Sequence, residues 1–121
     1  MNEVIPYLRR GQIVVASLDP VVGAVAAKTR PVVIVSNNTA NAAALRADGV
    51  VTVVPLTSNT ARVFPFQVLL PVGQTGLPQD SKAQAEQVRA LSVSRIGGIV
   101  GWVPAELLGA IDDALRLHLA L

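Results

Sequence analysis

The sequence predicts a mainly β fold with helices (α+β), in which a strongly curved sheet or small barrel carries its helices on the outside. Three observations lead to this prediction. Short runs rich in Val and Ile recur along the chain, and Pro, Gly and Asp-Gly separate them. One short stretch, residues 40–46, favours a small inner helix. The C-terminal stretch places its apolar residues at helical spacing.

Length and composition indicate a single domain. The chain has 121 residues, of which 51% are hydrophobic and 15% charged, so one sizeable core is available and disorder is not expected. We expect one domain over residues 1–121, with residues 1–9 as a short leader. The net charge of +2 is compatible with a nucleic-acid partner but also with many others.

The residue types that are missing exclude several chemistries. The absence of cysteine excludes disulfides, thiolate metal sites and cysteine nucleophiles. The chain has a single histidine, His118, which excludes a histidine-rich metal site. A Ser-His-Asp triad would have to use His118, and this residue lies on a predicted amphipathic helix. We therefore expect no metal and no cofactor. The sequence offers no membrane span and no signal peptide, so a cytoplasmic protein is expected.

Three strands are predicted in the first half of the chain. Gln12–Leu18 is rich in Val and Ile. Pro31–Ser36 is a continuous apolar run, which is typical of a central strand buried on both faces. Between it and the strand Val50–Leu56, Asn37 and its neighbours offer cap chemistry for the helix over residues 40–46.

The second half is expected to hold two more strands and the last helix. Gln67–Leu70 is a short strand ended by Pro71, and Ile99–Val103 is the final one. Pro104, at a first-turn position, begins the amphipathic helix. Its apolar face is formed by Leu108, Ile111, Leu115 and Leu119.

The pattern over Ser81–Leu91 is ambiguous. Its alternation is weak, and residues 83–86 suit a helix by propensity alone. Ser94–Gly98 is expected to form a short helical turn.

Two polar segments adjoin predicted strands and indicate an anion site. Arg30 stands at the mouth of an apolar strand, and Pro31 biases it toward an extended backbone. The polar cluster Thr57–Thr60 follows another strand. A fixed cation and a row of hydroxyls at two strand mouths favour a phosphate or another anion. Taken alone, Arg30 is more often a strand-end surface residue than a catalyst.

Four motifs in the same order resemble the MazF/PemK (Kid) toxins of bacterial toxin–antitoxin systems. The resemblance runs from Arg10 to Leu121. Each motif alone is weak, but four in register make a chance match improbable. The motifs are Arg10-Gly11-Gln12-Ile13 with Leu18-Asp19-Pro20; Lys28-Thr29-Arg30-Pro31 with the apolar run to Asn37; Val54-Pro55-Leu56-Thr57-Ser58-Asn59; and Asp80-Ser81 with Gln87-Val88-Arg89-Ala90-Leu91 and Ser94-Arg95.

The resemblance implies an SH3-like small barrel that acts as a homodimer. It also implies a sequence-specific, metal-independent endoribonuclease that cuts single-stranded RNA and thereby inhibits translation and growth. A cognate antitoxin would inhibit it through an extended C-terminal segment lying in the RNA groove. The catalytic pair of the family maps to Arg30 and Thr57.

The chain departs from the family pattern in two places. Residues 82–85, Lys-Ala-Gln-Ala, are smaller and more polar than the apolar strand expected there. Gly98 and Ile99 stand where basic residues often occur. Neither departure touches the catalytic pair.

With so few reactive groups, the RNA itself is the expected nucleophile. The ribose 2′-hydroxyl attacks the adjacent phosphorus and leaves a 2′,3′-cyclic phosphate and a 5′-hydroxyl end. Arg30 suits the stabilisation of phosphorane charge, because its planar fork holds two oxygens. Thr57 donates to a non-bridging oxygen. Since arginine normally remains protonated, we expect Arg30 to clamp the phosphate and protonate the leaving oxygen.

Six further residues are expected to bind RNA, and three of them have a plainer alternative. Arg62 is otherwise solvated surface charge, Arg89 otherwise pairs with Glu86 or Asp80, and Asn59 otherwise caps a turn. The six are Lys28, Ser58, Asn59, Arg62, Gln87 and Arg89.

Two rival functions stay open at this point. A toxin of the same fold could bind and poison a protein such as DNA gyrase without catalysis. A degenerate member could bind only its antitoxin or RNA. The presence of both Arg30 and Thr57 favours the enzyme over either rival.

Overall fold

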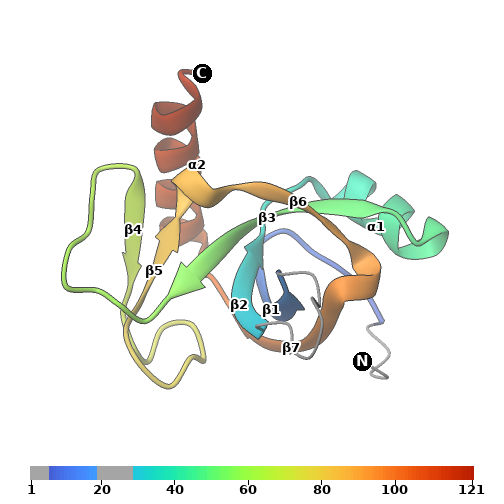
Figure 1. Cartoon of the computed structure of the whole chain (residues 1–121), viewed down its shortest axis with the longest axis horizontal. Coiled ribbons are helices and arrows are strands. Elements are labelled where there is room, and N and C mark those ends of the chain that lie inside the picture. The colour runs from blue at the N-terminus through green and yellow to red at the C-terminus, as the bar shows by residue number, and fades with distance from the viewer. Residues whose placement is uncertain (1–5, 19–28) are drawn as a thin grey trace, which may run out of the picture.

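The computed structural model describes residues 6–18 and 29–121, and these form one curved antiparallel sheet with helices outside it (Figure 1). Within these ranges, no helix is long and apolar enough to cross a membrane. The helical elements are α1 (Asn38–Ala47), α2 (Ala105–Leu119) and two single turns, η1 (Ala85–Gln87) and η2 (Val93–Arg95). The strands are β1 (Gln12–Ser17), β2 (Thr29–Ile34), β3 (Val50–Thr57), β4 (Gln67–Leu70), β5 (Ser81–Gln84), β6 (Arg89–Ser92) and β7 (Ile96–Trp102).

The strand order confirms the predicted α+β class. The sheet runs β4-β5-β3-β2-β1-β7, and β6 also pairs with β3. The long strand β3 therefore pairs with β6 along Val50–Val53 and with β5 at Leu56 and Thr57. Among the described strands, β6 and β7 do not pair with each other and are connected through the single turn η2. The sheet is therefore strongly curled, but hydrogen bonds among its described residues do not close it into a barrel.

Apolar side chains fill both faces of the central strands. Val32, Val33 and Ile34 of β2 are all fully buried, which confirms the two-sided burial predicted for this run. One cluster includes Leu8, Val14, Ala16, Val32, Ile34, Val51, Val53 and Leu91. The other includes Ile13, Val33, Val54, Leu56, Leu70, Ala83 and Ile111.

The two helices begin where their sequence signals predict. The Asn37 side chain accepts a hydrogen bond from the backbone N–H of Ala40 at 2.8 Å and caps α1. Pro104 immediately precedes α2. Ile111 and Ala114 are buried, but Leu119 is 48% exposed, so the predicted apolar face packs only along the first part of α2. The end of this helix projects from the body of the molecule (Figure 1).

The ambiguous segment is mostly extended. Residues 81–92 form β5 and β6, and the helical propensity of residues 83–86 is expressed only as the single turn η1 between the two strands. Both strands pair with β3, and this cross-strand pairing overrides a weak helical preference. The expected turn over Ser94–Gly98 is shorter, because η2 ends at Arg95 and β7 begins at Ile96.

Candidate active site and RNA-binding surface

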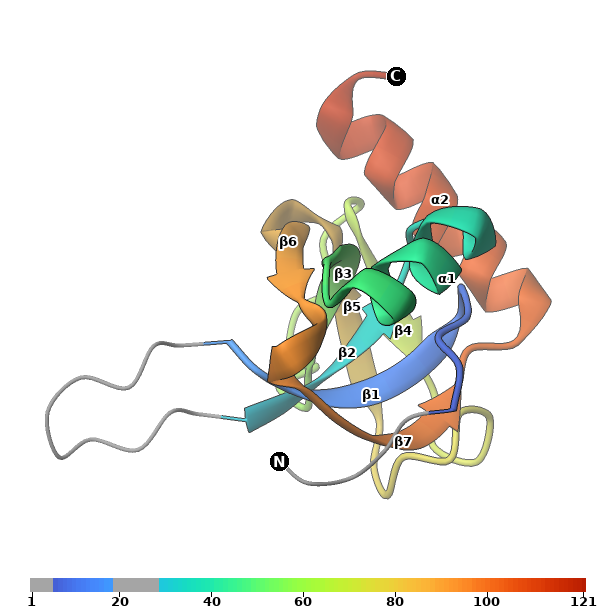
Figure 2. The same cartoon turned by 90° about the vertical axis from the view of Figure 1, so that its right-hand side faces the viewer.

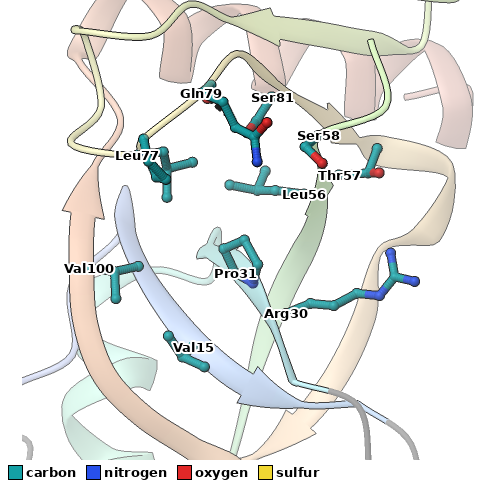
Figure 3. A pocket seen from close by; sticks show the side chains of 11 residues that line it. Val15, Arg30, Pro31, Leu56, Thr57, Ser58, Leu77, Gln79, Ser81 and Val100 are labelled. Carbon is teal, nitrogen blue, oxygen red and sulfur yellow. Dashed lines mark hydrogen bonds between the residues drawn. The ribbon is translucent and has the colours of Figure 1, made fainter. Parts of the chain in front are cut away.

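Arg30 and Thr57 lie on the neighbouring strands β2 and β3 and line one pocket. The pairing of these strands begins at Val32, opposite Pro55. Arg30 and Thr57 each lie two residues beyond this pair, at the same end of the β2–β3 ladder. Arg30 is exposed and Thr57 is half-buried. Figure 3 shows the two side chains extending toward the same side of the site.

The pair forms one rim of a pocket of about 400 Å³. Polar tips of Ser58, Gln79 and Ser81 lie on another side of it, and Val15, Leu77 and Val100 make an apolar wall (Figure 3). Pro31, Leu56 and Pro78 complete the lining. The pocket is large enough for part of a nucleotide beside Arg30 and Thr57.

Gln79 is a pocket residue that the sequence analysis did not single out. It lies in the connection between β4 and β5. Nothing local marks it, because its place beside Ser58 depends on the pairing of β5 with β3.

The Thr57 hydroxyl is oriented by its own loop. Its Oγ1 accepts a hydrogen bond from the backbone N–H of Asn59 at 3.2 Å. A hydroxyl has a single proton and two lone pairs, so this contact leaves the proton available for an acceptor in the site. Asn59 Oδ1 accepts from the N–H of Ala61 at 3.4 Å, which agrees with the turn-capping alternative for this side chain.

Arg89 lies on the same face as the pair and spans to the end of β1. Arg89 is opposed to Val53, which shares a face of β3 with Thr57. Its guanidinium donates to the carbonyl of Leu18 at 3.0 Å. The alternative pairing with Glu86 or Asp80 is not what the structure has, since Glu86 accepts from Gln67 and Asp80 from the N–H of Val72.

The other predicted RNA-binding residues lie outside the pocket or outside the described residues. The Arg62 guanidinium carbon lies 5.3 Å from the ring centroid of Phe64. Gln87 is exposed at the end of η1. Lys28 falls outside the described residues. Within residues 6–18 and 29–121, no group of three or more His, Asp or Glu side chains could hold a metal ion.

The aromatic side chains form two stacked pairs on the surface. Trp102 is 41% exposed and stacks on Tyr7 with the ring centroids 6.4 Å apart. Phe64 and Phe66 stack in parallel with the ring centroids 5.4 Å apart, and neither is buried.

Comparisons with known proteins agree with this geometry. The model of the PemK-like, MazF-like toxins of type II toxin–antitoxin systems matches residues 9–119. The endoribonuclease MazF9 of Mycobacterium tuberculosis (strain ATCC 25618 / H37Rv) is 52% identical over 115 residues, covering 94% of this chain and 98% of that protein. The endoribonuclease EndoA of Bacillus subtilis (strain 168) is 28% identical, with 94% and 96% covered.

Solved structures show the same architecture. MazF from Deinococcus radiodurans superposes with a TM-score of 0.74 at 25% identity, covering 95% of this chain and 98% of that one. An endoribonuclease from Mycobacterial species in complex with its cognate antitoxin gives a TM-score of 0.71 at 27% identity, covering 93% and 95%.

The matches span nearly the whole chain, and they define its class as that of toxins of type II toxin–antitoxin systems. The chain belongs to the PemK-like, MazF-like family, which confirms the family predicted from the four motifs. The relatives named above are endoribonucleases, in agreement with the predicted enzyme class.

Proposed function

We propose that this chain is the toxin of a toxin–antitoxin pair and a metal-independent endoribonuclease that cleaves single-stranded RNA at specific sequences. The observation that carries the proposal is that Arg30 of β2 and Thr57 of β3 line the same pocket, at the end of the ladder that joins the two strands. Its substrate in the cell is mRNA, so the protein acts in the cytoplasm and inhibits translation and growth.

The reaction is a transesterification within the RNA. The 2′-oxygen attacks the adjacent phosphorus, and its proton passes to solvent. The bond from phosphorus to the 5′-oxygen breaks, and that oxygen takes a proton from Arg30, which regains one from solvent. The products are a 2′,3′-cyclic phosphate and a 5′-hydroxyl end. Arg30 holds two non-bridging oxygens and Thr57 donates to one, so both stabilise the charge that grows in the transition state.

The flanking strand follows the surface around the pair. Ser58 lines the pocket next to Thr57, and Asn59 and Arg62 continue along the same loop. Arg89 stands on the same face as the pair, four residues along the β3 register from Thr57. With Lys28 and Gln87, these groups hold phosphates and orient bases.

The proposed assembly is a homodimer inhibited by an antitoxin. Trp102, Tyr7 and Val100 are each 40% or more exposed, and such apolar exposure supports a protein interface. The solved complex of a related endoribonuclease with its cognate antitoxin supports a partner of the same kind here. We propose that an extended C-terminal segment of that partner lies in the RNA groove.

Incubation of the purified protein with a long single-stranded RNA in EDTA tests the proposal. Discrete fragments with cyclic phosphate and 5′-hydroxyl ends are expected, and end mapping also gives the target sequence. Uncut RNA together with inhibited supercoiling by DNA gyrase would instead establish the non-catalytic rival. An Arg30→Ala variant that cuts as fast as the wild type would remove the assigned active site.

A further inference from the structure

Lys82 is a buried lysine in the strand next to the proposed active site. It lies in β5, where it pairs with Thr57 on one side and with Leu69 on the other. Only 8% of its surface is exposed, whereas lysines are seldom buried in proteins. The residue therefore stands directly across from the catalytic threonine and carries a charge that is expensive to desolvate.

The ammonium group of Lys82 is used to hold a loop. Its Nζ donates to the backbone carbonyl of Arg62 at 2.5 Å. Two carboxylate–cation pairs occur among the described residues, Arg10 with Asp112 and Arg116 with Asp113, and Lys82 takes part in neither. The contact with the loop is thus the interaction that the structure gives this buried charge.

A second buried side chain holds the same loop from the neighbouring strand. Gln67 is 8% exposed, and its Oε1 accepts from the backbone N–H of Phe64 at 3.1 Å. Its Nε2 donates to Glu86 at 2.8 Å, which fixes the amide. The loop over residues 58–66 is therefore fastened at two backbone positions, while the side chains of Arg62 and Phe64 face outward.

We propose that Lys82 is a positioning residue for RNA recognition. It fixes the loop over residues 58–66 relative to Thr57, so that the RNA-binding groups of Ser58, Asn59 and Arg62 meet the strand in one arrangement. This role rests on the proposed endoribonuclease function. Lys82 does not touch the reacting atoms; it acts through the backbone of Arg62.

Stability alone does not explain a lysine at this place. An unbranched apolar side chain would fill the same space without the desolvation cost, and such replacements of buried charges are often neutral or stabilising. Stability and RNA recognition are therefore expected to respond differently to the loss of Lys82.

The test compares Lys82→Met, Lys82→Arg and the control Arg46→Met. Arg46 is an exposed cation on α1, so its variant removes the same charge away from the loop. For Lys82→Met we expect an unchanged or higher melting temperature, and a KM for a single-site RNA raised about tenfold. We expect kcat to change less than about threefold, because Arg30 and Thr57 remain. The set of RNA sequences that Lys82→Met cleaves should become wider. Lys82→Arg keeps the donor and the charge, so its KM and its cleaved sequences should match those of the wild type.

Hydrogen exchange supplies a readout that needs no RNA. The amides of residues 61–64 should exchange about tenfold faster in Lys82→Met and at the wild-type rate in Arg46→Met. The proposal would be overturned if Lys82→Met cleaved the same sequences as the wild type and its amides exchanged at the wild-type rate. A large drop in the melting temperature of Lys82→Met would also overturn it. So would an Arg46→Met variant with the same raised KM. A wild-type protein that leaves RNA uncut would instead refute the endoribonuclease function, while the exchange rates still report on the loop.

Discussion

Arg30 illustrates how much of the proposed chemistry depends on the shape of a charge and not only on its sign. The side chain is exposed at the start of β2, so packing does not explain it. In Arg30→Lys the charge remains, but the planar fork that holds two phosphate oxygens is lost. We expect kcat to fall about 100-fold and the melting temperature to stay unchanged. Initial rates on a single-site RNA measure this, and a wild-type rate would contradict a two-oxygen clamp.

In the proposed mechanism, Thr57 donates a hydroxyl proton whose direction is set by its neighbour. The backbone N–H of Asn59 donates to the Thr57 oxygen, which leaves the hydroxyl proton available for an acceptor. Thr57→Val keeps the branched shape and removes that donor, and kcat should fall about 100-fold. Thr57→Ser keeps the hydroxyl and should stay within about tenfold of the wild type. Equal losses in both variants, measured by initial rates, would show that the methyl group matters instead.

At the scale of elements, alanine substitutions at two glycines are expected to change the free energy of unfolding in opposite directions. A Cβ atom on Gly101 of β7 would lie 2.0 Å from the carbonyl oxygen of Thr75, which accepts a hydrogen bond from Trp102. Gly101→Ala should therefore lower the free energy of unfolding by about 3 kcal/mol or more. A Cβ on Gly109 of α2 meets nothing within 4 Å, so Gly109→Ala should raise it by about 1 kcal/mol.

Urea unfolding of both variants checks this pair of predictions. A Gly101→Ala variant as stable as the wild type would show that Gly101 is not held close to Thr75 in solution. The sequence places Gly101 in a predicted strand and Gly109 in a predicted helix, but it does not show the contact with Thr75, because only the connection between β4 and β5 brings Thr75 onto the edge of β7.

The segment over residues 81–92 shows where local propensity fails. Ala and Glu favoured a helix at residues 83–86, but β3 offers open hydrogen-bonding edges at both of its ends. Pairing there buries Ala83 and Leu91 in different clusters, and this burial outweighs a propensity difference of a few tenths of a kcal/mol per residue. In contrast, the Asn37 cap and the proline before α2 act within a few residues, and both signals located their helices.

At the scale of the whole molecule, the small net charge of +2 means that RNA binding depends on where cations lie. Each phosphate contact with single-stranded RNA contributes about −0.7 to the slope of log K against log salt. Arg62→Ala should reduce the steepness by about that amount. Arg46→Ala should leave the slope unchanged, because Arg46 lies on α1, which follows the C-terminal end of β2 (Figure 2). Arg30 lies at the N-terminal end of that strand. Titration of an RNA with a 2′-deoxy nucleotide at the cleavage position provides the slopes without cleavage. Identical slopes for the wild type and Arg62→Ala would assign Arg62 to the ring of Phe64 alone.

The sequence by itself determined both helices, most of the strands and the family motifs that single out Arg30 and Thr57, because periodicity, caps and motif order are properties of neighbouring residues. Tertiary structure decided what those residues face. The pairing of β2 with β3 brings Arg30 and Thr57 to one pocket, and the pairing of β5 with β3 sets the buried Lys82 beside Thr57. Contacts between strands distant in sequence depend on which strand edges pair and in which register. The burial of side chains on both faces of the sheet selects the register, and this burial exists only once the sheet has formed.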